Sequence, residues 1–570
     1  MEKSWEFVKS PDESKVRVLS KELNVNQDLA ALLIQRDIGT FEEARKFFRP
    51  DISQLHDPFL MADMDKAVNR LSQALANNEK ILIYGDYDVD GTTSVALMVL
   101  FLRQFTDQIE YYIPDRYSEG YGLSETGMQW AAENGFSLII SLDCGIKAVN
   151  IAGLVNELKM DLIICDHHLP GDHLPDAYAV LDPKRIDCSY PYKELSGCGV
   201  GFKLLHGFAI QQSLPLEQLY NLLDLVAVSI ASDIVPITGE NRMLAFFGLR
   251  KLNMNPLPGL KELIEIAGKK PPLTISDIVF YIGPRINATG RLTHAKESVR
   301  LLISKDEADI KEFSSQLNQT NIDRRSFDLN TTEEALEMIS CDLPEKDRKS
   351  TVLYKEDWHK GVIGIVASRC IDTYYRPTII LTQSNGKATG SARSVEGFDI
   401  YEAISACSDL LDQYGGHMHA AGLTMPVENV EAFQERFESE VAKRIHEDQL
   451  VPKIHVDRKV NFSFVNTKTF SILNQMAPFG PQNMQPVFVT EDIILAAPAR
   501  VLKESHLKLQ VRQTDHPKVL DAIGFGLAGF AAALNTGEPF RMAYQIVENN
   551  YMGNVSLQLM IKDIKFYAAE

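Results

Sequence analysis

Residues 81–91 read Ile-Leu-Ile-Tyr-Gly-Asp-Tyr-Asp-Val-Asp-Gly, so a short apolar run ends at a glycine and is followed by Asp86, Asp88 and Asp90. A continuous apolar run of this length is typical of a strand that is buried on both faces of a parallel sheet. Three carboxylates at every second position repel one another, and their burial is costly unless a cation neutralises them. The stretch therefore predicts a buried strand whose end holds divalent cations. A solvated acidic turn is the alternative for the motif on its own.

Three further apolar runs stop at an aspartate in the same way. They cover residues 138–142, 162–165 and 177–181, and they end at Asp143, Asp166 and Asp182. Helix-like stretches separate the runs, at residues 93–105, 124–134 and 147–158. This alternation predicts an α/β fold with an open parallel sheet. Ligands of such sheets bind at the carboxyl ends of the strands, which is where the acidic side chains stand.

Acidic and imidazole side chains recur at these predicted strand ends. Asp143 ends the second run, Asp166, His167 and His168 end the third, and Asp233 follows an apolar helix. Any one of them could be a helix cap or a structural residue, but the set together indicates a metal site. Carboxylates and imidazoles without a thiolate favour Mn²⁺ or Mg²⁺ over structural zinc. Two such ions side by side support in-line displacement at phosphorus, so we expect phosphoester hydrolysis.

The remaining sequence predicts further segments. Residues 305–339 predict one long connecting helix, and a second α/β pattern begins near residue 350. Residues 507–512 alternate between apolar and polar side chains, which predicts a small β-barrel near the C-terminus. The expected division is a helical lead-in (1–75), a catalytic domain (76–303), the connecting helix (304–342), a second α/β domain (343–445) and the barrel (446–570).

Composition limits the class of protein. Of the 570 residues, 45% are hydrophobic and 24% are charged, which is ordinary for a globular protein. The net charge of −19 argues against a protein that coats duplex DNA, although it allows a local basic groove. No apolar run reaches the roughly 18 residues of a membrane span, and the first residues lack a signal peptide, so we expect a cytoplasmic protein. The seven cysteines include no CxxC pair, which disfavours a zinc ribbon.

Four of these segments, taken in order, resemble the successive motifs of the DHH phosphoesterase superfamily. They are residues 86–91, Asp143-Cys144-Gly145, Asp166-His167-His168 and Ala231-Ser232-Asp233. The resemblance implies that two metal ions are held by Asp88, Asp90, Asp143, His167 and Asp233, with Asp143 as the bridge. It places Asp86 and His168 in or beside the first coordination shell. Several relatives have a histidine four residues before Asp88, where this chain has Tyr84.

Other segments resemble the RecJ nucleases within that superfamily. Residues 415–422 are similar to the glycine-rich signature of the DHH-associated domain, and residues 390–394 to the segment that holds a 5′-terminal phosphate. Residues 283–291 resemble another stretch typical of RecJ, and the barrel resembles its OB-type domain. The substrate-binding residues that we expect are Arg116, Arg285, Asn287, Arg291, Ser391, Arg393, Gly415, Gly416, His417, Lys508 and Arg512.

The resemblance implies a 5′→3′ exonuclease that degrades single-stranded DNA to 5′-mononucleotides with two Mn²⁺ or Mg²⁺ ions, in recombination and repair. Its expected partner is single-stranded DNA with a 5′ end, together with a single-strand-binding protein and a RecQ-type helicase. We expect a monomer. One alternative is a DHH phosphodiesterase for short oligonucleotides or cyclic dinucleotides. An alternative of another class is a non-catalytic scaffold that binds DNA.

Overall fold

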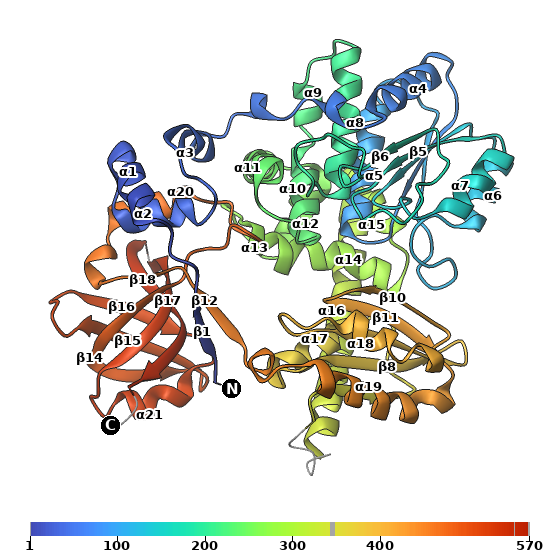
Figure 1. Ribbon diagram of the computed structural model, residues 1–570. Helices are drawn as coiled ribbons and strands as arrows, with labels where there is room; N and C mark the ends of the chain where they lie inside the picture. Colours follow the sequence, from blue (N-terminus) through green and yellow to red (C-terminus); the bar gives the residue numbers. More distant parts are fainter. Residues whose placement is uncertain (1, 342–347, 552, 568–570) are drawn as a thin grey trace. The chain divides into compact units, whose positions relative to one another are not determined.

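The computed structural model describes residues 2–341, 348–551 and 553–567 (Figure 1). Contacts divide the chain into two compact units, which are described separately below. Unit 1 contains residues 1–49, 327–477 and 485–570, and unit 2 contains residues 50–326 and 478–484. Within the described part of the chain, no helix is both long enough and apolar enough to cross a membrane.

Unit 2 is built on a parallel five-stranded sheet with the order β3-β2-β4-β5-β6. The strands are β2 (Ile81–Gly85), β3 (Ile109–Tyr112), β4 (Leu138–Leu142), β5 (Asp161–Cys165) and β6 (Ala179–Leu181). The predicted α/β fold with a parallel sheet is therefore confirmed. Strand β3 was missed, because it is a half-exposed edge strand in which Glu110 interrupts the apolar run.

Side chains alternate along the strands, so each face of this sheet has its own core. Ile81, Ile83 and Ile140 share a core with helices α4 (Met64–Ala76), α5 (Val89–Leu102) and α8 (Gly197–Gln211). Leu82 and Ile139 share the other core with helices α6 (Glu125–Glu133) and α7 (Val149–Glu157). Residues buried on both faces explain why these strands read as continuous apolar runs.

The rest of unit 2 is helical and packs beside the sheet. Its helices are α9 (Glu217–Tyr220), α10 (Leu223–Ser232), α11 (Gly239–Met254), α12 (Pro258–Ile266), α13 (Ile275–Asp277), the π-helix η3 (Ile278–Ile282), α14 (Gly283–Leu292) and α15 (Lys296–Ile303). Short 3₁₀ turns, η1 (Ile52–Gln54) and η2 (Pro58–Leu60), precede α4. The predicted connecting helix is α16 (Glu307–Cys341), whose residues contribute to both units.

Unit 1 contains the first residues together with the C-terminal half of the chain. Its first element is a strand, β1 (Ser4–Phe7), which pairs in parallel with β12 (Lys453–Val456). The prediction of a wholly helical lead-in is therefore wrong at its start, because a four-residue strand has no recognisable pattern without its partner. Helices α1 (Glu13–Leu23), α2 (Gln27–Ile34) and α3 (Phe41–Phe48) follow. Thr40 and Glu43 form a capping box at the start of α3.

Two sheets complete unit 1. The first has the order β10-β11-β9-β8-β7 and packs with α17 (Ile363–Thr373), α18 (Ile400–Ser405) and α19 (Val430–Arg444). Its strands are β7 (Thr351–Tyr354), β8 (Thr378–Ser384), β9 (Lys387–Arg393), β10 (Gln413–His417) and β11 (Ala420–Met425). The second is the predicted barrel, which the pairing of β14 with β17 closes. Its elements are β13 (Arg458–Lys459), α20 (Thr467–Gln475), β14 (Phe488–Leu502), β15 (His506–Gln513), β16 (Val519–Gly524), α21 (Ala531–Leu534), β17 (Phe540–Tyr551) and β18 (Asn554–Phe566). The predicted domain boundaries stay predictions.

The packing of α10 against α11 depends on Gly248. A Cβ atom at this position would meet the carbonyl oxygen of Leu223, and it would lie 2.6 Å from Cβ of Ala227. We expect Gly248→Ala to lower the free energy of unfolding by about 1–3 kcal/mol, because overpacking forces the two helices apart. Urea unfolding would measure the change. Gly153→Ala in α7 is the matched control, since nothing lies within 4 Å of its new Cβ. There the better helix propensity of alanine should stabilise the protein slightly. Equal effects of the two substitutions would contradict the packing argument.

Candidate metal centre

The register of the parallel sheet brings the predicted site residues to one edge. Gly85, Leu142 and Cys165 lie opposite one another at the ends of β2, β4 and β5. The residue that follows each of these strands is an aspartate, and His167 comes directly after Asp166. The sheet therefore collects these side chains at its carboxyl edge, as the sequence predicted.

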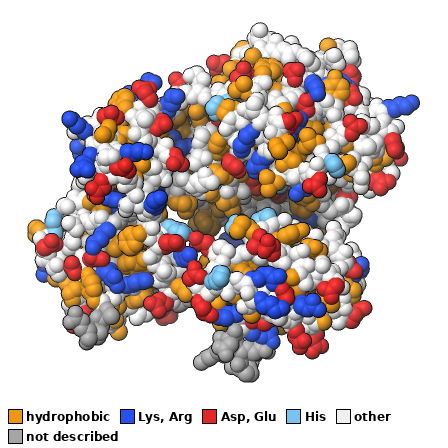
Figure 2. Space-filling view, in the orientation of Figure 1, with side chains coloured by type: hydrophobic (Ala, Val, Ile, Leu, Met, Phe, Trp, Pro, Cys, Tyr) orange, Lys and Arg blue, Asp and Glu red, His pale blue; other side chains and the backbone are white. Residues whose placement is uncertain are grey.

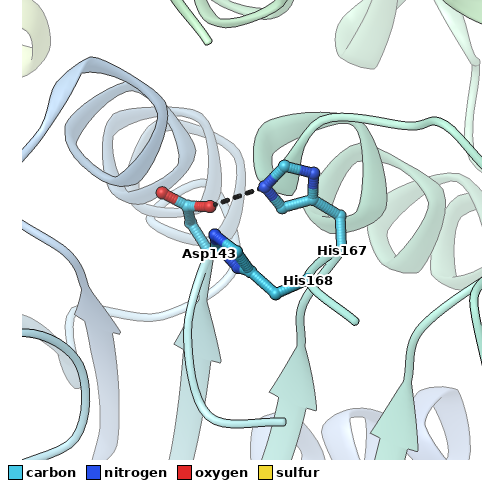
Figure 3. A group of neighbouring side chains, drawn as sticks. All are labelled: Asp143, His167 and His168. Atoms are coloured by element: carbon cyan, nitrogen blue, oxygen red, sulfur yellow. Dashed lines mark ion pairs between the residues drawn. The ribbon is translucent and has the colours of Figure 1, made fainter. Parts of the chain in front are cut away.

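His167 lies at the middle of the cluster. Its Nε2 atom is 3.1 Å from Oδ1 of Asp143, 3.6 Å from Oδ2 of Asp233 and 3.8 Å from Oδ2 of Asp90. Figure 3 shows that the rings of His167 and His168, which follow β5, both lie beside Asp143, which follows β4. Two groups have ligand atoms within 4.8 Å of one another, and they share His167. They are Asp143, His167 and His168, and Asp90, His167 and Asp233.

The donor set fits a divalent cation. Oδ1 of Asp143 and both ring nitrogens of His167 are buried, and none has a hydrogen-bond partner among the described residues. The 3.1 Å approach of Asp143 to His167 is thus a close contact without hydrogen-bond geometry. Buried polar atoms without partners cost free energy, and coordination would satisfy them. Carboxylate and imidazole ligands together suit Mn²⁺ or Mg²⁺.

The electrostatics of the cluster lead to the same conclusion. Burial, followed by the charges of neighbouring carboxylates, raises the pKa of Asp86, Asp88, Asp143 and Asp233. Burial also lowers the pKa of His167 to about 4, so its imidazole is neutral and able to act as a ligand at neutral pH. The carboxylates of the cluster therefore resist full ionisation by themselves, and a bound cation would reverse that preference.

Asp90 is held in place by the start of helix α8. The backbone N–H groups of Gly197 and Cys198 donate to its two carboxylate oxygens at 2.7 and 2.8 Å, and the Ser229 hydroxyl donates at 2.7 Å. Gly197 also lies against Asp143, since a Cβ there would approach within 2.6 Å of Cβ of that aspartate. The predictions from the sequence do not include this support. The signal was Ser196, an N-cap before an apolar stretch, whose side chain accepts from the N–H of Gly199.

Asp166 fixes the second histidine. Its Oδ1 lies 2.7 Å from Nδ1 of His168, and its Oδ2 accepts from the N–H of Ile146. Burial alone would raise the pKa of Asp166, but the hydrogen bond and charge of His168 lower it to about 2. The same pair raises the pKa of His168 to about 9, against the opposing effect of burial. Tyr121 donates to the carbonyl oxygen of Asp143, and its hydroxyl also lies 3.4 Å from the His168 ring.

The other residues of the first motif lie beside the two groups. The Asp88 carboxylate caps helix α5 by accepting from the N–H of Gly91, and the buried Asp86 accepts from the N–H of Gly122 at 3.4 Å. Neither residue belongs to either close group of possible ligands, so their roles remain predictions. Tyr84 is buried, its hydroxyl donates to the carbonyl of Gly122, and its ring stacks on Tyr112. This tyrosine has a structural role in the second core.

Some of the predicted substrate-binding residues of unit 2 contact other residues of the protein. The guanidinium of Arg116 lies 5.0 Å from the ring centre of Tyr87. In the sequence, Tyr87 stands between Asp86 and Asp88, two of the predicted metal ligands. Arg285 donates to Asn318 and to the carbonyl of Tyr281. Arg285, Asn287 and Arg291 all belong to α14, where no helix was predicted. Their binding of substrate stays a prediction.

A second cluster of predicted residues forms on the first sheet of unit 1. Ser391 of β9 pairs with Gly422 of β11, which pairs in turn with Gly415 of β10. In the next such row, Ala420 of β11 lies between Arg393 and His417. The Arg393 guanidinium donates to the Ser391 hydroxyl at 3.0 Å. Gly364, in the first turn of α17, leaves room for this pair, because a Cβ atom added there would lie 2.8 Å from both side chains. Gly416 has a φ of 147° in the β10–β11 hairpin, which glycine adopts easily.

The outer face of the barrel carries the last predicted contacts. Lys508 and Arg512 point the same way from β15, and Arg500 of β14 lies beside Lys508 in register. The sequence analysis missed an aromatic pair near them. The rings of His506 and Phe525 lie 5.2 Å apart, and Phe525 is 59% exposed. Phe525 stands alone between two glycines, so only the position of β16 beside β15 could reveal the pair.

Three family models match this chain in succession. The model for the N-terminal domain of the DHH family matches residues 80–230, the DHHA1 domain model matches residues 347–443, and the RecJ OB domain model matches residues 456–563. These matches confirm the resemblance to the DHH superfamily and to its RecJ branch.

Similar proteins and structures agree with the family models. The single-stranded-DNA-specific exonuclease RecJ of Bacillus subtilis is 38% identical over 563 residues, which cover 98% of this chain and 70% of that protein. The protein of the same name from Salmonella typhimurium is 33% identical, over 88% of this chain and 90% of its own length. The crystal structure of RecJ in complex with Mn²⁺ from Thermus thermophilus matches with a TM-score of 0.85 and 26% identity, over 99% of this chain and 80% of that one.

The raised pKa of the buried carboxylates predicts how Asp143→Asn changes stability. A carboxyl group whose pKa is higher in the folded than in the unfolded state binds protons more tightly when folded. Without metal, its contribution to stability therefore falls as the pH rises above about 4. The substitution removes one such charge and keeps the shape of the side chain. At pH 7.5 without metal, we expect the variant to melt about 2–4 °C above the wild type, measured by scanning fluorimetry.

Addition of Mn²⁺ should reverse this order of stability. The Tm of the wild type should rise, and more at pH 8 than at pH 5.5, whereas the variant should respond weakly. Asp224→Asn is the control, because burial raises the pKa of Asp224 to about 6 but the residue lies outside both ligand groups. It should keep the wild-type response to Mn²⁺. An equal Mn²⁺ response in Asp143→Asn would contradict the assignment of this metal centre.

Proposed function

Because the chain belongs to the family of single-stranded-DNA-specific exonucleases named RecJ, we propose that it degrades single-stranded DNA from the 5′ end to 5′-mononucleotides. The reaction is hydrolysis of a phosphodiester with the help of two Mn²⁺ or Mg²⁺ ions. The observation that carries the proposal is the buried cluster around His167, in which three carboxylates lie 3.1–3.8 Å from one imidazole nitrogen.

The proposed metal ligands are Asp86, Asp88, Asp90, Asp143, His167 and Asp233. Two bound cations would supply an activated water and stabilise the charge that develops on the phosphate oxygens. The protein keeps the ligand oxygens in place before substrate arrives. The N–H groups at the start of α8 prevent the Asp90 carboxylate from rotating, and Asp166 orients the ring of His168 beside Asp143. His168 would thereby orient the scissile phosphate.

The cluster on the first sheet of unit 1 suits a 5′-terminal phosphate. Arg393 offers a planar, permanently charged donor, and Ser391 offers a hydroxyl 3.0 Å from it. Gly415 and Gly416 in the neighbouring hairpin leave the backbone accessible, and His417 lies in the same row as Arg393. Recognition of a terminal phosphate by this group would set the polarity of degradation.

The remaining proposed contact residues would hold the DNA strand without reading its sequence. We assign this role to Lys508 and Arg512 on the barrel, with His506 and Phe525 as a surface on which bases stack, and to Arg116, Arg285, Asn287 and Arg291 in unit 2. Figure 2 shows basic and acidic side chains interspersed, so the net charge of −19 does not form one continuous acidic surface on that face.

The biological setting follows from the same proposal. A 5′→3′ exonuclease for single strands acts after a helicase has separated a duplex, so we propose roles in recombination and repair. A RecQ-type helicase and a single-strand-binding protein are the partners that this substrate requires. We propose that the enzyme acts as a monomer.

The activity can be tested with a long single strand that carries a 5′-phosphate and a label at either end, in the presence of Mn²⁺. We expect immediate release of the 5′ label as a mononucleotide, while the 3′ label stays on long fragments and matched duplex is spared. Cleavage of dinucleotides alone would instead indicate an oligonucleotide phosphodiesterase. Binding of the strand without cleavage would indicate a scaffold and overturn the proposal.

The role of Arg393 can be tested with the same strand bearing either a 5′-phosphate or a 5′-hydroxyl. We expect Arg393→Ala to raise KM for the phosphorylated strand by about 10–100-fold, because charge-assisted hydrogen bonds contribute about 1.5–3 kcal/mol. The preference for the phosphate should disappear. Lys387→Ala is the control, since Lys387 lies at the other end of the same strand and pairs with Asp412 at 3.0 Å. Retention of the phosphate preference by Arg393→Ala would exclude this anchor.

A further inference from the structure

Ile234 has an unusual backbone conformation directly beside the metal centre. It follows Asp233, which is the C-cap of helix α10, and its φ is 59°. This is the left-handed region, in which Cβ of an L-residue approaches its own carbonyl oxygen. Glycine or asparagine usually occupies this position after a helix, because the left-handed conformation costs them little.

Ile234 differs from the other described residues that have a positive φ. Thirteen described non-glycine residues have a positive φ, and seven of them are aspartate or asparagine. Ile234 is the only β-branched residue in that described set. A β-branched residue in this region is a true outlier, because two heavy atoms on Cβ increase the crowding. Such strain persists only where something else compensates for it.

Burial within the protein does not provide the compensation. The Ile234 side chain is 62% exposed, whereas Val235 is 8% exposed and Ile237 is fully buried. The turn thus places one apolar side chain of the segment in solvent and the next ones in the core. An asparagine at residue 234 would keep the turn, avoid the strain and expose no apolar surface. Packing within the described part of the protein therefore does not explain an isoleucine at this position.

We propose that Ile234 packs against the sugar or base of a nucleotide that flanks the scissile phosphate. The inference rests on the proposed nuclease function. Asp233 Oδ2 lies 3.6 Å from Nε2 of His167, and consecutive Cα atoms are about 3.8 Å apart, so the exposed side chain of Ile234 starts from the backbone next to a proposed metal ligand. An apolar surface contacts the face of any sugar or base without reading hydrogen bonds, which suits an enzyme that degrades strands of any sequence.

The proposal predicts opposite effects on stability and on substrate binding. Ile234→Gly and Ile234→Asn relieve the strain, so we expect each to raise Tm by about 1–3 °C. Each also removes the contact, so KM for a long 5′-phosphorylated strand should rise about tenfold, with a smaller change in kcat. Ile234→Val keeps a β-branched apolar side chain and should retain the wild-type KM.

Lys159→Gly is the matched control. Lys159 also follows the C-cap of a helix, α7, has a φ of 59° and is exposed, but it lies outside the metal centre. It should show the rise in Tm without any change in KM. If the role of Ile234 is purely structural, Ile234→Gly will also raise Tm and leave KM unchanged. That outcome would overturn the proposal.

Substrates with one abasic nucleotide locate the contact. We expect an abasic site at the first or the second position of the strand to raise KM for the wild type. The same lesion should raise the KM of the Ile234→Gly variant much less, because the lesion and the substitution remove one shared contact. If the effects of the lesion and of the substitution on KM are fully additive at both positions, Ile234 contacts the sugar and not the base. An unchanged KM in Ile234→Gly would exclude the contact altogether. If the wild type itself fails to cleave the unmodified strand, the nuclease proposal fails independently of Ile234.

Discussion

The first turn of helix α8 donates two backbone N–H groups to the carboxylate of Asp90, while Gly197 in that turn lies against Asp143. Both aspartates are buried, and their charges repel, so separation of the helix from the sheet edge would leave a buried charge unpaired. The positions of α5, α8 and β4 are therefore fixed by the same contact. The two cores of unit 2 pack around that arrangement and keep the sheet edge rigid.

The departures from ordinary protein chemistry gather at this edge. Asp143 has a φ of 61°, His167 has unpartnered buried nitrogens, several carboxylates have raised pKa values, and Ile234 is strained. Each of these features costs folding free energy when no ligand is present. A protein retains such costs where binding or chemistry compensates for them. Residues at and beside this edge thus mark the functional centre by their conformation, their hydrogen bonding and their charge.

The sequence predicted the elements that have a local signature. The apolar runs at 81–84 and 138–142 became β2 and β4, and the long helix expected over residues 305–339 became α16. Elements with a weak local signature, or with none, were missed. Strand β1 is four residues long and depends on β12, which lies about 450 residues away along the chain. Helix α8 begins with Gly197-Cys198-Gly199, a stretch of weak helix formers that a tertiary contact stabilises.

By itself, the sequence determined the chemical inventory of the site and the sheet edge at which it lies. The residue that follows a parallel strand lies at the carboxyl edge of the sheet. In this chain the aspartates and histidines of the site follow the strands directly. Only the tertiary structure decided how they are used. The pairing of β2, β4 and β5 set the distances to His167, α8 fixed Asp90, and the turn after α10 exposed Ile234. These properties depend on contacts between residues far apart in the chain, which no local pattern encodes.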